Sequence, residues 1–409
     1  MQTPHISERM QQVLASMHQF LDFEANSAYA QYAGDPDVCD FAFGNPQEMP
    51  LPAFTAALQR WSVPLNKDWY AYKMSEPAAC EAVAASLRQR HGLPFEAEDI
   101  SMTNGGFAAL AVALCAITDP GDEVIFISPP WFFYEALILA NGGRPVRVRI
   151  DMDSFDLDLA AIGAAITPRT RAIIINSPHN PTGKIYPPAT LQSLAGLLAD
   201  AGRRLGRDIY LISDEAYSRI VFDGRPYPSP AVFYPNTFLC YTYGKTLLTP
   251  GQRLGYIALP PAMPGRSQLR TALLAAQAMT GYAFPNALLQ HALPDLEPLS
   301  IDLAHLQRKR DRLFAALREM GYQLHLPEGT FYLLARAAWE DDLAFCELLA
   351  EYKILCLPGT VVEMPGYFRT SLTANDAMIE RALPGFAEAL RRAGQSLEKN
   401  HEPMPMSRL

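Results

Sequence analysis

Several features are scarce or missing in this sequence of 409 residues, and each absence excludes a class of protein. No apolar run approaches the ~18–20 residues of a membrane-spanning helix, and the N-terminal MQTPHISERM lacks the apolar core of a signal peptide. The six cysteines are scattered, without a CxxC pair or the spacing of metal ligands. We therefore expect a cytoplasmic protein with buried free thiols, no metal site and no membrane partner.

Positive charge is also in short supply. Lys+Arg 34 against Asp+Glu 43 gives a net charge of −9, and no basic cluster stands out, so we expect no nucleic-acid partner. The composition, 49% hydrophobic and 19% charged, is that of a soluble globular protein. A chain of this length is too long for one ordinary core, which predicts one large and one small domain.

Alternating strand and helix patterns predict the fold class, which is α/β. Strand patterns lie near 99–102, 123–127, 144–149, 171–175, 209–213, 237–241 and 254–259. They predict a large domain with a mainly parallel seven-stranded sheet, covered by helices, whose loops converge on one side. A helical pattern, SERMQQVLASMHQFLDFEA, occupies residues 7–25. After about residue 285 the pattern changes to that of a smaller α+β domain.

The predicted division of the chain has four parts. Residues 1–50 form an N-terminal arm and part of the small domain, and residues 51–290 form the large domain. Residues 291–398 form the C-terminal small domain, and the polar residues 399–409 are a loose tail.

One stretch, YTYGKTLLTPGQRLGY at 241–256, holds a candidate nucleophile. The apolar run TFLCYT predicts a buried strand that delivers Lys245 into a loop, and Arg253 follows before a second strand pattern, LGYIAL. A lysine on a solvated loop is the ordinary interpretation. A lysine that is desolvated or close to another cation loses its proton and becomes a nucleophile toward carbonyls.

A second stretch predicts a phosphate site. The strand ISM runs into Asn104-Gly105-Gly106, and an apolar helix begins at once. This order points free backbone N–H groups and the positive end of the helix at the turn, which typically holds phosphate. The turn is not GxGxxG, and a lone glycine pair is a weak indication.

Three further strand ends carry candidate side chains. Trp131 follows EVIFI and two prolines, where it could stack on a flat ring or serve in the core. Asn180 follows a buried strand in NSPHNPTG, where open α/β sheets place ligands, although a tight turn is the simpler interpretation. Asp214 ends the strand IYLIS, and a buried carboxylate is costly unless a positive charge pairs with it. Acidic helix caps also occur at such positions.

Taken together, these residues match the needs of pyridoxal phosphate: a Schiff-base lysine, an acid beside the pyridine nitrogen and anchors for the phosphate. The chain resembles the class I/II aminotransferases, which are fold-type I pyridoxal-phosphate enzymes, from FGNP at 43 to FRTSLT at 368. The most specific pieces are NSPHNPTGKIY, SDEAY followed by FDG, and GKT with GQRLGY. The resemblance implies an aspartate aminotransferase-like fold in which residues 51–290 bind the cofactor.

The resemblance also implies roles around the cofactor ring. Lys245 would form the Schiff base and carry the proton to and from the substrate Cα, and Asp214 would pair with the pyridine N–H. Asn180 and Tyr217 would hydrogen-bond the phenolate oxygen, and Trp131 would stack on the ring.

Anchors for the phosphate follow from the same resemblance. They comprise the backbone N–H groups of the glycine turn and two side chains: Gly105, Gly106, Phe107, Thr242 and Arg253. The planar fork of an arginine suits bidentate phosphate binding. Tyr70 would reach the phosphate of a partner subunit, which implies a homodimer with shared active sites.

For the substrates, the resemblance implies that Arg369 grips the α-carboxylate, with Gly44 and Asn180 beside it. The chain would move the amino group of an L-amino acid to a 2-oxo acid by a ping-pong mechanism. One alternative is another reaction on the same cofactor, either β-elimination (a C–S lyase) or an oxygen-dependent oxidation or hydroxylation. A distant alternative is a non-catalytic cofactor-binding regulatory domain, for which the ~40 residues before FGNP are too few to hold a DNA-binding module.

This sequence departs from the family pattern at several positions, which bear on substrate choice and reaction type. Gly244 stands where the family often has serine, and Phe107 stands in the phosphate turn where a small or amide residue is common. The segment after Tyr70 has Ser75 and Ala79-Cys80 in place of a glycine and a Leu-Arg pair.

Overall fold

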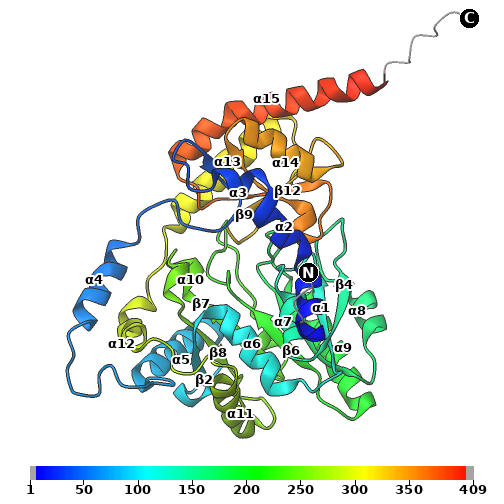
Figure 1. Ribbon diagram of the computed structural model, residues 1–409. Helices are drawn as coiled ribbons and strands as arrows, with labels where there is room; N and C mark the ends of the chain where they lie inside the picture. The colour runs from blue at the N-terminus through cyan, green and yellow to red at the C-terminus, as the bar shows by residue number, and fades with distance from the viewer. Residues whose placement is uncertain (1–5, 402–409) are drawn as a thin grey trace, which may run out of the picture. The chain divides into compact units, whose positions relative to one another are not determined.

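The computed structural model describes residues 6–401, with side chains to residue 395, and divides into two compact units. The first unit comprises Met1–His18, Met49–Leu303 and Glu328–Thr330, and the second comprises Gln19–Glu48, Ala304–Pro327 and Phe331–Leu409. Figure 1 shows the chain coloured along its length. The four-part division stays a prediction, and residues 402–409 of the predicted tail lie outside the described residues.

A seven-stranded sheet forms the centre of the first unit, in the order β2-β8-β7-β6-β5-β3-β4. Its strands are β2 (Ile100–Thr103), β3 (Glu123–Ser128), β4 (Arg144–Arg149), β5 (Thr170–Asn176), β6 (Tyr210–Asp214), β7 (Thr237–Thr242) and β8 (Gly255–Ala258). β8 is antiparallel to both its neighbours, and all other neighbouring pairs are parallel. The predicted α/β fold with a mainly parallel seven-stranded sheet is confirmed.

Strand direction decides which loops meet. β2 is antiparallel to β8, and β8 is antiparallel to β7, so β2 runs in the same direction as β7. The carboxyl ends of β2, β3, β5, β6 and β7 therefore share one edge of the sheet with the amino end of β8. In open α/β sheets this edge is where ligands bind.

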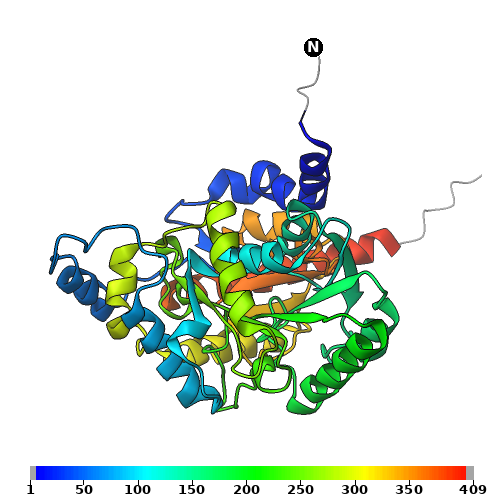
Figure 2. The same cartoon turned by 90° about the horizontal axis from the view of Figure 1, so that it is seen from below.

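Helices cover both faces of this sheet (Figures 1 and 2). On one face lie α6 (Gly105–Ile117), α7 (Tyr134–Ala140) and α11 (Arg266–Met279), and on the other lie α4 (Pro52–Trp61), α5 (Pro77–His91) and α12 (Ala287–Leu296). Along β7, Phe238 and Cys240 belong to the first core, and Leu239 and Tyr241 belong to the second. This alternation is the period of a strand that is buried on both faces.

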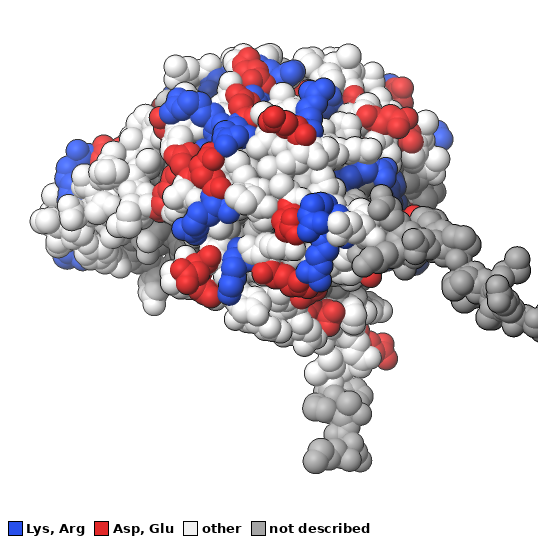
Figure 3. Space-filling model, turned by 90° about the horizontal axis from the view of Figure 1, so that it is seen from above, with Lys and Arg blue, Asp and Glu red and all other residues white. Residues whose placement is uncertain are grey.

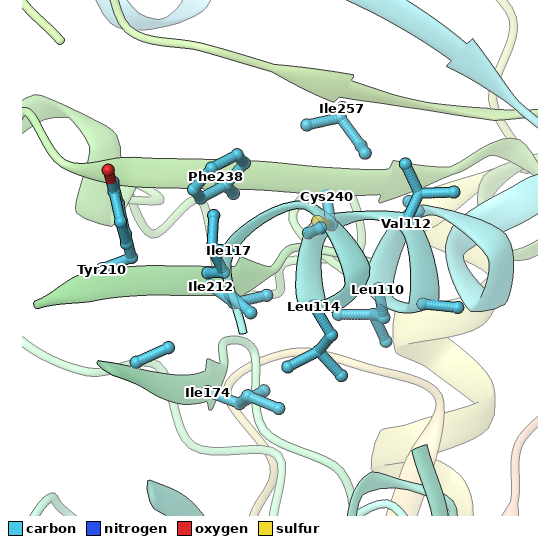
Figure 4. Packing of buried hydrophobic residues seen from close by; sticks show 14 of the residues in the cluster. Leu110, Val112, Leu114, Ile117, Ile174, Tyr210, Ile212, Phe238, Cys240 and Ile257 are labelled. Atoms are coloured by element: carbon cyan, nitrogen blue, oxygen red, sulfur yellow. The ribbon is translucent and has the colours of Figure 1, made fainter. Parts of the chain in front are cut away.

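The core beneath α6 combines aliphatic and aromatic side chains (Figure 4). Leu110, Leu114 and Ile117 point from the helix toward Ile174, Ile212 and Phe238 on three neighbouring strands. α6 contains no charged residue over its thirteen positions, so all its sides can be buried. Two more helices of the unit, α8 (Leu159–Ala165) and α9 (Pro188–Leu205), follow β4 and β5 in the chain.

The N-terminal helical pattern at 7–25 folds as two helices. α1 (Glu8–Ser16) ends at Met17, whose N–H turns back to the carbonyls of Val13, Leu14 and Ala15, and α2 (His18–Asn26) follows. The boundary between the two units falls after His18, so the pattern is shared between two separately packed cores.

The second unit contains a three-stranded sheet, β11 (Leu357–Pro358), β12 (Tyr367–Ser371) and β9 (Tyr332–Arg336), with antiparallel pairing. A two-stranded parallel sheet joins β1 (Cys39–Asp40) to β10 (Ile354–Leu355). Its helices are α3 (Ala28–Tyr32), α13 (Leu303–Met320), α14 (Asp342–Glu351) and α15 (Asp376–His401). Phe368 packs against Tyr322, Phe345 and Phe386 in its core. The unit is α+β, as predicted.

Charged side chains of both signs are interspersed on the face shown in Figure 3. Exposed pairs such as Arg312 with Glu380, 2.7 Å apart, contribute little stability singly because water screens them. Among residues 6–401, no helix combines the length and the apolar character that crossing a bilayer requires.

Candidate active site

Most of the predicted cofactor residues lie at the single sheet edge where the strand ends meet. Gly105, Gly106 and Phe107 open α6 after β2, and Trp131 follows β3. Asn180 follows β5, Asp214 ends β6, and Tyr217 lies three residues further on. Thr242 ends β7, Lys245 lies in the one-turn helix α10 (Tyr243–Thr246), and Arg253 lies two residues before the start of β8.

Close packing explains the glycines of the turn before α6. Gly105 has φ +80°, and a Cβ there would lie 2.9 Å from Nη2 of Arg253. A Cβ on Gly106 would lie 3.3 Å from Cβ of Thr242, and one on Gly255 would lie 2.8 Å from the backbone of Gly105. Glycine is therefore required for the backbone to approach these side chains. The N–H groups of α6, Arg253 and Thr242 together form a cradle that any side chain on the turn would fill.

Arg253 occupies a strained conformation in this cradle. Its φ of +50° is in the left-handed region, which costs a residue other than glycine about 1–3 kcal/mol. Its Nη1 donates to the carbonyl of Pro250 at 2.8 Å. Desolvation lowers the pKa of Arg253 below its ordinary value, because partial burial disfavours the guanidinium cation. A bound phosphate dianion would offset that cost directly.

Asp214 is a buried carboxylate, 8% exposed, at the carboxyl end of β6. Oδ2 accepts a hydrogen bond from the hydroxyl of Tyr134 at 2.6 Å, and Oδ1 accepts one from the N–H of Ala216 at 3.2 Å. Burial raises the pKa of Asp214, and the amine of Lys245 offsets only part of that shift. A pyridinium N–H, which is a compact cation and donor, suits such a group.

The Tyr134 hydroxyl is a contact that sequence reasoning did not assign. The sequence places this tyrosine in a run of aromatic residues after Trp131, with no local sign of a bond to an aspartate 80 residues away. Full burial beside Asp214 raises the pKa of Tyr134 well above its ordinary value, so the hydroxyl keeps its proton and donates.

Lys245 is carried by a helix of only four residues. Thr242 caps this helix, since its Oγ1 accepts from the N–H of Gly244 at 3.4 Å, and Nζ of Lys245 lies 5.8 Å from the centre of the Tyr217 ring. A Cβ on Gly244 would lie 2.9 Å from Cα of Pro250. The space that a serine would need beside the lysine is thus taken by the backbone of the following loop.

An aromatic wall explains the other departure in the phosphate turn. Phe107 meets Trp131 edge to face, with ring centres 5.2 Å apart, and Trp131 meets Tyr134 in the same way at 5.6 Å. Phe133 packs against both Phe107 and Trp131. Edge-to-face contacts hold an aromatic ring in a defined plane, which a stacking residue requires.

The NPTG loop is held by polar contacts that the sequence did not reveal. Asn176 donates from Nδ2 to the carbonyl of Asp214 at 2.8 Å and accepts at Oδ1 from the N–H of Asn180 at 2.8 Å. His179 is 1% exposed and lies between the Pro129 carbonyl (3.0 Å) and the Thr182 hydroxyl (2.8 Å). Because a carbonyl only accepts, Nε2 carries the proton and Nδ1 accepts from Thr182.

The remaining predicted residue of the first unit, Tyr70, lies between α4 and α5 and is 54% exposed. Its hydroxyl donates to the carbonyl of Ser62. Tyr72, two residues on, is 85% exposed and packs on Phe284 at 4.7 Å between ring centres. The rings of Tyr72 and Phe284 thus form an exposed aromatic pair.

The second unit holds the predicted carboxylate site. Arg369, on β12, is 1% exposed, donates from Nη2 to the carbonyl of Ala42 at 2.9 Å and lies with Cζ 3.9 Å from the centre of the Tyr332 ring. A Cβ on Gly44 would lie 2.7 Å from the hydroxyl of Tyr332 and 2.6 Å from Cε2 of Phe331. Gly44 and Arg369 therefore share Tyr332 as a neighbour, and a guanidinium buried on an aromatic ring is suited to a carboxylate.

The residues of the first unit fit pyridoxal phosphate. The glycine cradle with Arg253 provides donors and positive charge for a phosphate, and Asp214 provides a buried acceptor for a pyridinium. Lys245 lies between them along the sheet edge, since β7 separates β8 from β6. Among the described residues, no group of three or more His, Cys, Asp or Glu side chains could hold a metal ion.

Comparisons with known proteins agree with this geometry. The family model for aminotransferase class I and II matches residues 36–386. An aspartate/prephenate aminotransferase from Thermus thermophilus is 32% identical over 374 residues, which cover 88% of this chain and 90% of that protein. An aspartate aminotransferase from Thermotoga maritima is 28% identical over 390 residues, covering 92% of this chain and 97% of that protein.

Solved structures share the whole fold. An aminotransferase from Eubacterium rectale has a TM-score of 0.87 at 30% identity and covers 96% of this chain and 100% of that chain. The aspartate aminotransferase of Thermus thermophilus with maleate has a TM-score of 0.80 at 27% identity, covering 95% and 100%. This chain therefore belongs to the class I and II aminotransferase family and is a pyridoxal-phosphate-dependent aminotransferase.

Proposed function

We propose that the chain transfers the amino group of an L-amino acid to a 2-oxo acid, with the cofactor held at the sheet edge of the first unit. The observation that carries this proposal is the placement of Lys245 between the buried carboxylate of Asp214 and the cradle of Gly105 and Arg253. These three features supply an amine, an acceptor for a pyridinium and a phosphate site on neighbouring strands. Few other cofactors need all three.

Pyridoxal phosphate, when bound, supplies an electron sink that stabilises negative charge at the substrate Cα. Asp214 would keep the ring nitrogen protonated, and Tyr134 orients the Asp214 carboxylate by donating to Oδ2. Arg253, Thr242 and the N–H groups of α6 would bind the phosphate, and Trp131, held edge to face by Phe107, would stack on the ring. Asn180 and Tyr217 would bind the phenolate oxygen.

Lys245 Nζ would hold the cofactor and, once the substrate amine has released it, would remove the proton from the substrate Cα and deliver it to a different carbon. In the second unit, Arg369 binds the substrate α-carboxylate, supported by Tyr332 and Gly44. Because both substrates are 2-substituted carboxylates, the same arginine serves the amino acid and the oxo acid. In the ping-pong order the first product leaves before the second substrate binds, so double-reciprocal plots against one substrate at several concentrations of the other should be parallel.

The test begins with purified protein carrying its cofactor. Borohydride reduction followed by peptide mapping should place the label on Lys245. A panel of L-amino acids, beginning with aspartate because several relatives are named for it, is then assayed with and without a 2-oxo acid acceptor. Product formation that requires the acceptor supports the proposal. Ammonia or peroxide without an acceptor would instead identify elimination or oxidation, and a label on another lysine would contradict the assignment of Lys245.

We also propose that the chain acts as a homodimer in which Tyr70 reaches the phosphate of the partner's site. The support is that Tyr70 is 54% exposed and that the exposed rings of Tyr72 and Phe284 pack on each other. Met279 (81% exposed) and Leu65 (73% exposed) are further large apolar side chains left at the surface of the same unit. Exposed aromatic and apolar side chains are typical of protein interfaces.

Mixing two defective variants tests this second proposal. Y70F and K245A are each purified, then mixed and allowed to exchange subunits. If Tyr70 acts across the dimer, half of the dimers become hybrids with one intact site, so activity rises to about a quarter of wild type. Activity that stays at the sum of the separate variants would show that Tyr70 serves its own subunit or no site at all.

A reducing compartment, the cytoplasm, is the location that the thiols support. All six cysteines are free, and five of them, Cys39, Cys80, Cys240, Cys346 and Cys356, are buried. Unpaired cysteines are common in proteins of reducing compartments.

A further inference from the structure

The helix that carries Lys245 is too short to hold itself in place. α10 has four residues, and a single helical turn is unstable without tertiary contacts. Its position must therefore come from what lies beneath it. The core on that side includes Tyr241 and Tyr243, and the buried charged side chains of Arg219 and Glu297 lie against these two tyrosines.

The hydroxyl groups of two tyrosines hold α10 in place. The hydroxyl of Tyr243, the first residue of the helix, donates to Oε2 of Glu297, and the hydroxyl of Tyr241 lies 2.6 Å from Oγ1 of Thr246. The carbonyl of Thr246 also accepts from the N–H of Ile301 at 2.9 Å. The residues on both sides of Lys245 in the helix are thus tied to the segment 297–301.

Glu297 is in turn held by Arg219. The two form a salt bridge with side-chain exposures of 7% and 12%, and Nη1 of Arg219 also donates to the Glu297 carbonyl at 2.8 Å. Cζ of Arg219 lies 4.9 Å from the centre of the Tyr241 ring and 5.6 Å from that of Tyr243. Burial opposes the charge of Arg219, but Tyr241 and Glu297 together raise its pKa above the ordinary value. A paired charge in this position resists movement because any shift exposes it to apolar surroundings.

The direction of the hydrogen bond from Tyr243 is also fixed. Complete burial, with Glu297 beside it, raises the pKa of Tyr243 well above its ordinary value. The hydroxyl therefore keeps its proton over the whole working pH range and always donates to the carboxylate.

The network joins two parts of the site. Arg219 lies two residues after Tyr217, and Tyr243 lies two residues before Lys245. We propose that Glu297, bound by Arg219 on one side and by Tyr243 on the other, positions the Lys245 turn relative to the Asp214–Tyr217 segment. These are positioning residues, because none of their atoms needs to touch the cofactor or the substrate. The inference rests on the proposed role of Lys245.

Tyr243→Phe is the mildest test, because it removes one hydroxyl and leaves the ring that packs on Arg219. Tyr234→Phe is a matched control: Tyr234 is 4% exposed, lies in the same unit and donates its hydroxyl to the Ile209 carbonyl at 2.6 Å, outside the network. Both variants should fold and lose similar thermal stability.

Three measurements on the full-length protein separate positioning from plain stability. In Y243F we expect kcat to fall about tenfold with KM for the amino acid changed less than about twofold, because the amine is misplaced while substrate binding is intact. The pH midpoint of the absorption of the Lys245-linked cofactor should also shift. Without cofactor, amide hydrogen exchange of the peptide covering residues 243–249 should quicken, while Y234F should match wild type in all three.

Glu297→Gln provides a second variant with the volume of the side chain retained. It should shift the same pH midpoint and quicken exchange in the same peptide, with a larger loss of stability because Arg219 loses its counter-charge. If Y243F matches Y234F in kcat, pH midpoint and exchange, the positioning role is wrong even though Lys245 carries the label. If borohydride labels a different lysine in the wild-type protein, both the proposed function of Lys245 and this inference fall together.

Discussion

The strands of the central sheet serve two regions of opposite character. Under α6, Phe238 and Cys240 of β7 pack among aliphatic and aromatic side chains (Figure 4). Two residues further along the same strand, Thr242 lies in the cradle, where Arg253 has a strained backbone. On the neighbouring strand β6, burial raises the pKa of the Asp214 carboxyl. Packing in the core stabilises the fold. Backbone strain and buried charge at the sheet edge lower its stability, but they hold groups that the reaction needs. Substitutions should separate the two properties.

The largest expected effect is at Lys245. Lys245→Ala should lower kcat on the order of 10⁴-fold or more, because the amine both holds the cofactor and moves the substrate proton. Its urea midpoint should stay close to that of wild type, since Lys245 is only partly buried. Initial-rate assays and equilibrium unfolding of the same preparations check both statements. Residual transamination within a hundredfold of wild type would contradict the assignment.

Asp214→Asn should be the next largest. The amide cannot provide the negative charge that keeps a ring nitrogen protonated, so we expect a loss of about 10²–10³-fold in kcat. The Asn variant relieves a buried charge, so its stability should be equal to or greater than that of wild type. Activity assays and unfolding curves measure the two effects. A drop in stability with normal activity would show that Asp214 contributes to the stability of the fold and not to the reaction.

Phe238→Ala tests the other region. The side chain is fully buried, and its removal should cost about 3–5 kcal/mol of unfolding free energy through lost packing and a cavity. The specific activity of the folded protein should remain within about twofold of wild type. Denaturant titration gives the first quantity, and assays normalised to bound cofactor give the second. A large loss of specific activity would mean that packing in the core also determines activity at the carboxyl end of β7.

The lowered pKa of His179 should make the stability of the folded protein depend on pH. Burial lowers its pKa to about 4 in the folded protein, below the ordinary value of 6.5. Between pH 6.5 and pH 4 the unfolded chain binds a proton that the folded chain does not, so stability falls by about 3 kcal/mol as the pH is lowered through this window. His179→Gln should remove that share of the slope. Urea midpoints of both proteins at several pH values test this, and parallel slopes would contradict it.

Gly244→Ser should have the smallest effect, and it examines the departure beside the lysine. A Cβ would lie 2.9 Å from Cα of Pro250, so the loop must shift, at a cost of about 1–3 kcal/mol. The double variant Gly244→Ser with Pro250→Ala keeps the Cα of residue 250 in place, so it should be as destabilised as Gly244→Ser alone. Unfolding curves of the single and double variants provide the measurement. A serine variant as stable as wild type would show that the loop yields freely.

Sequence alone was sufficient for features that are local. The seven strands, the glycine turn before α6 and the order of Lys245 and Arg253 each depend on neighbouring residues and a fixed spacing. Contacts between distant segments were not accessible in this way. The bond from Tyr134 to Asp214 joins residues 80 positions apart, and that from Tyr243 to Glu297 joins residues 54 apart.

Gly244 shows why a departure can be noticed in a sequence and still not be understood. The sequence indicates that a side chain is missing next to Lys245, but the reason lies in the path of the backbone at Pro250. Likewise, the break at Met17 in the N-terminal helical pattern reflects the separate packing of two units, which the periodicity of residues 7–25 does not contain.

The reversed direction of β8 has a consequence for how this chain can change over evolution. Because β7 and β8 are antiparallel neighbours, Lys245 and Arg253 lie on one continuous hairpin. The separation between the proposed covalent anchor and the proposed phosphate anchor is therefore set by the length of a single short connection, residues 246–252. The lengths of the other loops can drift while this one cannot, so insertions and deletions between Lys245 and Arg253 should be absent from every active relative, however far the sequences diverge.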